Sequence, residues 1–163
     1  MRALTARELG TALGSSARPI FTVFKNMEEV QLAVVVEAKN IYWKYIEGLK
    51  DFQKIGLQYI HFAQEEPKLF QLIFMAEDVD SPLVLKEITN DISMYYNNIN
   101  IMKEQFNFDN KESNEFLKYL WIFGHGIATL LVSNQAKFSD EEIEQMLYDV
   151  GAAMFVKITS HEE

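Results

Sequence analysis

Apolar residues recur at steps of three and four along most of the chain, which is the spacing of one face of an α-helix. The clearest stripe runs from Leu85 to Phe106 and alternates these two steps without an error. Similar stripes run over residues 30–49, 52–62 and 143–158. The segment from about Ser113 to Ser133 is apolar nearly all round, as is typical of a helix buried between neighbours. The pattern predicts an all-α fold.

Polar residues mark the starts of several of these helices. Three N-cap residues are each followed three residues later by Glu, so that side chains satisfy the first backbone N–H groups: Thr5 with Glu8, Asn26 with Glu29, and Ser139 with Glu142. We expect a short helix from about Ala6 to Leu13, ended by Gly14. Ser16 as a cap and Pro19 in the first turn predict a second short helix from Ala17 to Phe24.

A long helix from Met27 to Lys50 is expected next, and it joins this N-terminal part to the rest of the chain. Pro67 and Pro82 can each begin a further helix. Only three prolines and seven glycines interrupt the 163 residues, which favours helices over short strands and turns.

Composition excludes several kinds of chemistry. The chain has no cysteine, so disulfides, thiolate zinc sites and cysteine nucleophiles are excluded. No apolar segment of signal-peptide length follows Arg2, and we expect a cytoplasmic protein. The uncharged segment from Tyr119 to Ala136 touches the lower length limit of a membrane-spanning helix. It holds His125 and ends in SNQA, so we interpret it as a buried interface helix and expect no membrane contact.

Charge is divided unevenly along the chain. The formal net charge is −9, yet residues 1–26 carry +3 and residues 51–163 carry −11. A basic tip on an acidic body is suited to a protein that docks on DNA with one end, because phosphate attraction acts over short distances in salt.

Two short helices separated by a glycine-containing turn and followed by a long helix can place the second helix in a major groove. Residues 4–30 resemble the DNA-binding core of the TetR family of transcriptional regulators. The matching features are a Thr cap, an apolar helix, Gly-x-Ser, an apolar-aromatic pair, Phe and an acidic helix start: Thr5, Leu9, Gly14, Ser16, Ile20 with Phe21, Phe24, and Glu28 with Glu29.

The resemblance implies that Ala17 to Phe24 is the recognition helix and assigns DNA contacts within and around it. Arg18 is the expected base reader, since its guanidinium matches the two acceptors of guanine, with Ala17 and Thr22 on the same helix. Phosphates would be held by hydroxyl, charged and helix-terminal groups at Thr5, Arg7, Ser16 and Lys25. The chain departs from the family at Phe21, where a tyrosine is usual, and at Met27, where a lysine is common.

TetR-type readers carry a full helix before the Thr cap, whereas only MRAL precedes Thr5 here. From this we expect that the first helix is missing and that Leu4, Leu9, Ile20 or their neighbours are exposed. Either the chain is truncated or its DNA binding is compromised.

The C-terminal half resembles TetR effector domains of the Trp-His-Gly type, whose signature is matched by Trp121, His125 and Gly126. The resemblance implies two domains, a helix-turn-helix DNA-binding domain over 1–48 and a ligand-binding and dimerisation domain over 49–163. Small residues at Gly124, Gly126 and Ala128, and at 151–153, indicate close helix packing and a homodimer formed through the last two helices. The alternative is packing within one chain.

Aromatic and thioether side chains predict a cavity for a lipophilic small molecule. Our candidate ligand contacts are Phe62, Phe70, Phe74, Tyr95, Met102, Trp121 and His125. The resulting expectation is a ligand-responsive repressor that binds a palindromic double-stranded operator as a dimer and is released by its effector.

Two other readings stay open. The alternative function is a helical interaction or ligand-binding protein that has lost DNA binding. An enzyme is disfavoured because His61, His125 and His161 form no metal-binding or catalytic motif; we expect no catalytic residue, metal or cofactor.

Overall fold

The computed structural model describes residues 5–75 and 92–160, with side chains from residue 98 onward in the second segment. Every regular element in these two segments is helical. The elements are α1 (Ala6–Ala12), the 3₁₀-helix η1 (Ile20–Thr22), α2 (Met27–Ile46), α3 (Phe52–Glu65), α4 (Pro67–Phe74), α6 (Ile92–Phe106), α7 (Asn110–Val132) and α8 (Asp140–Thr159). The predicted all-α class is confirmed for the described part of the chain.

The predicted helix starts are confirmed by their hydrogen bonds. The backbone N–H of Glu8 donates to the Thr5 hydroxyl at 3.3 Å, and that of Glu29 donates to the Asn26 side chain at 2.9 Å. Ser139 and Glu142 form the same reciprocal cap at the start of α8. A further capping box, Asp109 with Glu112, starts α7 at Asn110, three residues before the predicted start.

The predicted recognition helix from Ala17 to Phe24 is wrong in its extent. The segment forms turns around the single 3₁₀ turn η1 at Ile20–Thr22. Ser16 Oγ accepts from the backbone N–H of Arg18 at 3.4 Å, which is the contact expected of the predicted cap. The Thr22 hydroxyl donates to the Pro19 carbonyl at 2.6 Å.

The connecting helix α2 ends at Ile46, four residues before the predicted end at Lys50. Gly48 has φ +75°, a left-handed conformation that glycine adopts without steric cost and that ends a helix. Of the long stripe predicted from Leu85 to Phe106, the part from Ile92 onward is confirmed as α6. The preceding part, and the helix start at Pro82, lie outside the described residues.

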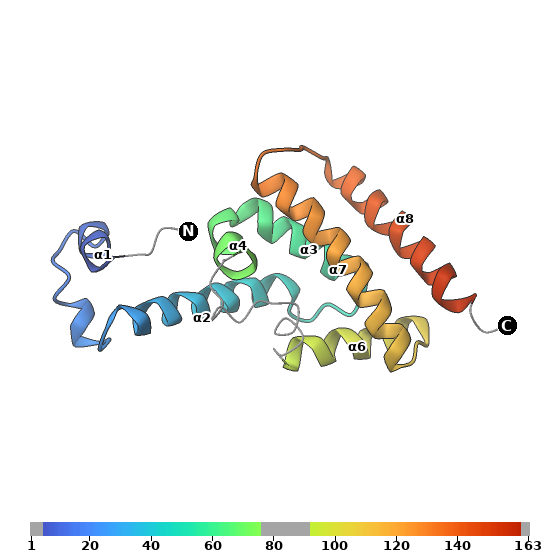
Figure 1. Cartoon of the computed structure of the whole chain (residues 1–163), viewed down its shortest axis with the longest axis horizontal. Helices are drawn as coiled ribbons and strands as arrows, with labels where there is room; N and C mark the ends of the chain where they lie inside the picture. The colour runs from blue at the N-terminus through green and yellow to red at the C-terminus, as the bar shows by residue number, and fades with distance from the viewer. Residues whose placement is uncertain (1–4, 76–91, 161–163) are drawn as a thin grey trace.

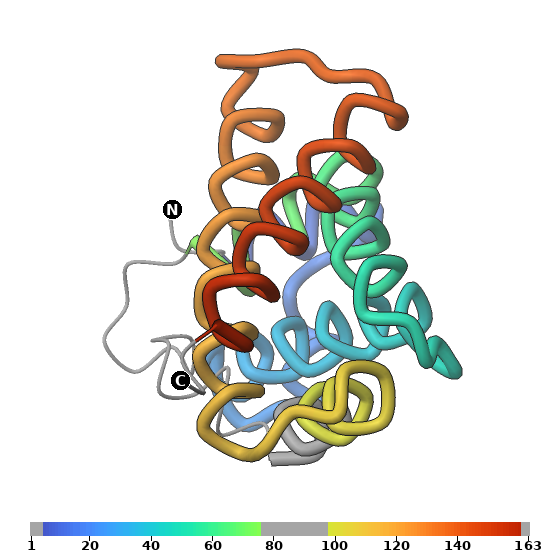
Figure 2. The backbone as a smooth tube through the Cα atoms, turned by 90° about the vertical axis from the view of Figure 1, so that its right-hand side faces the viewer, coloured from blue at the N-terminus to red at the C-terminus, as the bar shows by residue number. Residues whose placement is uncertain are grey.

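Helix α3 lies at the centre of the body and packs against α2, α4, α6, α7 and α8. Figure 2 shows α7 and α8 side by side, joined by the loop that precedes Ser139. The main core joins the second half of α2 to all the later helices, and its fully buried large side chains include Phe62, Phe70, Met102, Phe116 and Ile143.

The N-terminal elements α1 and η1 stand apart from this body, at the far end of α2 (Figure 1). The first half of α2 exposes Leu32 and Val36, whereas Ala38, Tyr42 and Ile46 in its second half are buried in the main core. Within the described residues we find no helix whose length and apolar character would let it span a bilayer.

Candidate functional site

A cavity of about 690 Å³ lies inside the helical body and is walled by α2, α3, α4, α6, α7 and α8. This volume is within the range of small-molecule sites in proteins. Most of the wall is apolar, and nine aromatic side chains contribute to it: Tyr42, Phe52, Tyr59, Phe74, Phe106, Phe116, Trp121, Tyr148 and Phe155. The cavity is therefore suited to a ligand with a large apolar surface.

The cavity opens toward the outer side of α7 and α8, where the lining residues Lys118, Tyr148 and Val156 are exposed. Lys118 is the single charged residue among the described lining residues, and no carboxylate lies there. The polar lining residues include the amides Asn98 and Gln105. Apart from the exposed Lys118, the described lining residues are thus uncharged.

The predicted ligand contacts fall into four groups. Phe74 and Trp121 line the cavity. Phe62, Phe70 and Met102 are fully buried in the core and are not among the cavity-lining residues, so their assignment as ligand contacts is not supported. The side chain of Tyr95 lies outside the described part of the structure. His125 is placed behind the wall, against two residues that line it.

His125 on α7 is held by the side chains around it. Its ring stacks on Trp121 with centroids 4.8 Å apart and on Phe70 at 5.8 Å. The Tyr59 hydroxyl and His125 Nδ1 form a hydrogen bond of 2.8 Å. Burial lowers the pKa of His125 below its ordinary value near 6.5, because desolvation disfavours the charged ring. His125 thus orients Trp121 and Tyr59 at the cavity wall as a neutral imidazole.

Three aromatic rings from different helices meet at the cavity wall. The Tyr42 ring on α2 lies 6.0 Å from that of Tyr59 on α3 and 5.4 Å from that of Phe74 on α4, and the latter two are 5.0 Å apart. Burial raises the pKa of both tyrosines well above 10, so both stay neutral. The helix that leads to the N-terminal tip therefore contributes directly to the cavity wall.

Sequence reasoning did not include Tyr42 and Gly124 among the ligand contacts. Both lie at helical spacings that core residues also occupy. Only the arrangement of the helices in space distinguishes a residue that lines the cavity from one that fills the core. Tyr42 lies at helical spacing from the buried Ala38 and Ile46, and this spacing is the same for a core residue and for a residue that lines a cavity.

The glycines of α7 make no close contact with another described helix of the same chain, which was the alternative to packing in a dimer. A Cβ atom at Gly124 or Gly126 would meet no atom within 4 Å. Gly124 is buried and lines the cavity, whereas Gly126 is exposed on the outer side of α7. Gly151 of α8 also lines the cavity, and a Cβ there would make ordinary contact with Leu120 at 3.9 Å.

Both α7 and α8 carry exposed apolar residues. On α7 these are Tyr119, Ile122, Gly126 and Leu130, spaced by three and four residues. On α8 they are Tyr148, Ala152, Phe155 and Val156, which also line the cavity. Ile122 is 48% exposed and Tyr148 is 59% exposed. We call these two sets of residues together the α7–α8 face.

The predicted DNA-contacting side chains lie around the tip, and most are exposed: Thr5, Arg7, Ser16, Arg18, Thr22 and Lys25. Ala17 is half-buried. Several of them have local partners. The Thr5 hydroxyl caps α1, and the Lys25 ammonium lies 3.6 Å from Glu29 Oε1. The guanidinium groups of Arg7 and Arg18 are the exposed cations of α1 and of the turn before η1.

Gly10 holds the two halves of the tip together, a role that the sequence reading missed. A Cβ atom at Gly10 would lie 2.8 Å from the backbone nitrogen of Ala17 and 2.9 Å from the carbonyl carbon of Ser16. Gly14, with φ +62°, ends α1, and Ser15 N–H closes the turn on the Gly10 carbonyl at 2.9 Å. The absence of a side chain at Gly10 thus fixes how closely α1 approaches the turn.

The expected exposure of the tip falls on neighbours of the named residues. Ile20 itself is buried and Leu9 is half-buried. The neighbouring Phe21 is 45% exposed, and Leu13, Val23 and Leu32 are exposed as well. Leu4 lies outside the described residues.

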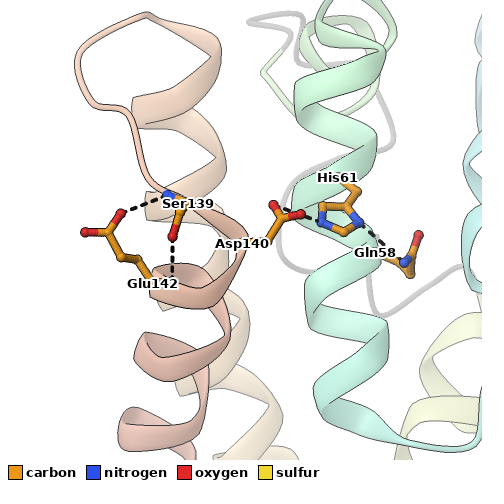
Figure 3. A network of polar contacts seen from close by, with 5 residues as sticks. All are labelled: Gln58, His61, Ser139, Asp140 and Glu142. Atoms are coloured by element: carbon orange, nitrogen blue, oxygen red, sulfur yellow. Dashed lines mark hydrogen bonds and ion pairs between the residues drawn. The ribbon is translucent and has the colours of Figure 1, made fainter.

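The histidines considered for catalysis have separate partners. Figure 3 shows His61 of α3 between Gln58 and Asp140, beside the Ser139–Glu142 cap of α8. His61 Nε2 lies 3.4 Å from Asp140 Oδ1. His161 lies outside the described residues. In the described segments, no three His, Asp or Glu side chains group in a way that could hold a metal ion.

Comparison of the chain with family models, with curated proteins and with solved structures finds no match. The functional assignment therefore depends on the cavity, the α7–α8 face and the tip.

Proposed function

We propose that this protein is a ligand-responsive transcriptional regulator of the TetR type, acting as a dimeric repressor that a lipophilic small molecule releases from DNA. The observation that carries this proposal is the position of α2. One helix contributes Tyr42 to the cavity wall and carries the basic tip at its other end. A molecule in the cavity and a duplex at the tip would thus act on the same rigid element.

The coupling has a simple geometry. Helix α2 has 20 residues and is about 30 Å long at 1.5 Å per residue. A ligand that displaces Tyr42 against Tyr59 and Phe74 would tilt α2, and a small tilt moves the tip by several ångströms. Two readers must be about 34 Å apart to enter successive major grooves, so such a movement would lower operator affinity.

Dimerisation is supported by the α7–α8 face. Its exposed apolar side chains have the helical spacing needed to pack against a second copy of the same two helices, and Gly126 and Ala152 within it leave room for a close approach. Two copies related by a two-fold axis would present two tips to a palindromic operator.

The test of DNA reading compares two exposed cations of the tip. We expect Arg18→Ala to reduce discrimination between the operator and random duplex by about 1 to 3 kcal/mol, because a base contact is lost. Lys25→Ala should weaken binding to both duplexes equally, as expected for the loss of a phosphate contact. The slope of the logarithm of the binding constant against the logarithm of the salt concentration should decrease in magnitude by about one. Equal losses on both duplexes for both variants would contradict the assignment.

A second candidate function is favoured by the tip itself. The recognition segment is one 3₁₀ turn, and a full helix is the usual element placed in a major groove. A helical ligand-binding protein that does not bind DNA would have the same cavity and the same α7–α8 face. Ligand binding without any salt-dependent affinity for duplex DNA would favour this reading.

A further inference from the structure

One polar atom of the cavity wall has no partner. Asn98 on α6 lines the cavity, and its side-chain oxygen is buried without a hydrogen-bond partner among the described residues. The large majority of buried polar side-chain atoms in folded proteins are hydrogen-bonded. An unpaired one at a cavity wall therefore indicates that its partner is a molecule that enters the cavity.

The other amides that line the cavity already have partners. The Gln105 side-chain oxygen accepts from the backbone N–H of Phe52 at 3.1 Å. The Gln53 amide donates to the Glu144 carbonyl at 3.5 Å, and the Asn114 amide donates to the Asn110 carbonyl at 2.6 Å. Among these described lining amides, Asn98 is thus the one with a buried oxygen that accepts no hydrogen bond. Because its oxygen can only accept, the partner must be a donor such as a hydroxyl or an amide N–H.

The charge of the wall restricts the ligand further. The described lining residues include no carboxylate, so a cation in the cavity would find no counter-charge among them. Moving an ion from water into an apolar cavity without a counter-charge costs far more free energy than one hydrogen bond to the ion contributes. Among the described lining residues, the one positive charge that an anion would meet is the exposed Lys118, and residues 51–163 of the body carry a net charge of −11. An uncharged ligand avoids both costs.

We propose that the cavity takes a neutral lipophilic molecule with a hydroxyl or amide N–H, and that the Asn98 side-chain oxygen accepts the hydrogen bond that orients it. This inference rests on the proposed function of the cavity as the effector site. The aromatic wall binds the apolar body of the molecule, and Asn98 discriminates between molecules with and without a donor.

The test uses isothermal titration calorimetry of the full chain with three probes that share one apolar body: 4-octylphenol, its methyl ether 4-octylanisole, and 4-octylbenzoate. We expect wild-type protein to bind the phenol about tenfold more tightly than the ether, since one buried hydrogen bond separates them. Asn98→Leu should reduce this ratio to about one. Asn114→Leu is the matched control and should keep the tenfold ratio, because that amide already has a partner.

Thermal unfolding without ligand is the second measurement. Asn98→Leu removes an unpaired buried oxygen and should unfold at the wild-type temperature or above it. If leucine does not fit, Asn98→Ala provides the same test of the phenol-to-ether ratio. An unchanged ratio in the Asn98 variants would overturn the role of Asn98 while leaving the cavity as the effector site. Tightest binding of the benzoate would overturn the neutral class, and no binding of any probe would overturn the proposed function itself.

Discussion

A larger side chain at Gly124 should fill part of the cavity, and it should raise the stability of the protein while lowering its affinity for the ligand. This glycine lies in the middle of α7, is buried, and has empty space where a side chain would begin. Gly124→Ala should stabilise the protein by about 1 kcal/mol, because glycine is about that much less favourable than alanine inside a helix. For a chain of this size that raises the unfolding temperature by roughly 2 to 4 °C.

Gly124→Leu adds the burial of an apolar side chain in the cavity. A fully buried leucine contributes about 1.5 to 3 kcal/mol relative to an exposed one, so the total gain should reach about 1 to 3 kcal/mol after allowance for imperfect fit. The same side chain occupies the ligand's space, and 4-octylphenol binding should fall at least tenfold by calorimetry. Stability and ligand affinity should therefore change in opposite directions.

The control for ligand binding is Gly126→Ala, two residues along the same helix. Its Cβ atom also meets open space, but the residue lies on the outer side of α7, away from the cavity. Because Gly126 belongs to the α7–α8 face, this variant controls for ligand binding alone and should bind the phenol as the wild type does. A Gly124→Leu protein that unfolds earlier than wild type, or that binds the phenol normally, would refute the cavity geometry.

Three further predictions concern the other surfaces and groups. Ile122→Lys on the α7–α8 face should raise the dimer dissociation constant measured by light scattering at least roughly tenfold, because it places an unpaired charge in the interface. The control Leu32→Lys, on the exposed part of α2, should leave this constant unchanged, and an equal effect of both variants would argue against the interface. Gly10→Ala should cost about 1 to 3 kcal/mol in the tip and abolish DNA binding while leaving calorimetric phenol binding intact, because its Cβ meets backbone atoms at 2.8 and 2.9 Å; normal DNA affinity would contradict the tip packing. The pKa of His125 is lowered in the folded protein, so the unfolded chain binds more protons than the folded one when the pH falls below the ordinary value near 6.5. The contribution of His125 to stability should therefore be complete above that pH and decline below it. His125→Asn should reduce this decline in unfolding temperature with falling pH, and an unchanged decline would show that other groups cause it.

Much of the fold was predictable because it depends on local rules. The caps at Thr5, Asn26 and Ser139, the stop at Gly14 and the helical stripes each depend on residues within a few positions of one another. The second short helix was mispredicted. Ser16 makes the expected cap contact with Arg18, but the backbone of Ser16 and Ala17 packs against Gly10 of α1 and the segment forms one 3₁₀ turn.

The cavity was predictable as a feature but not residue by residue. An aromatic at helical spacing has the same sequence signature whether it fills the core, as Phe62 and Phe70 do, or lines a cavity, as Phe74 and Trp121 do. Glycine has a similar ambiguity. At Gly10 the missing side chain permits a close backbone approach, whereas at Gly124 it leaves empty space, and only the positions of neighbouring elements distinguish the two.

The central claim is that a ligand in the cavity controls DNA binding at the tip. The most direct test selects duplexes from a randomised library with the wild-type protein, then titrates the selected duplex by fluorescence anisotropy with and without saturating 4-octylphenol. We predict enrichment of an inverted repeat, loss of affinity on adding the phenol, and no such loss with the Gly124→Leu variant. Failure to enrich any inverted repeat, or an affinity that the phenol leaves unchanged in the wild-type protein, would contradict the account.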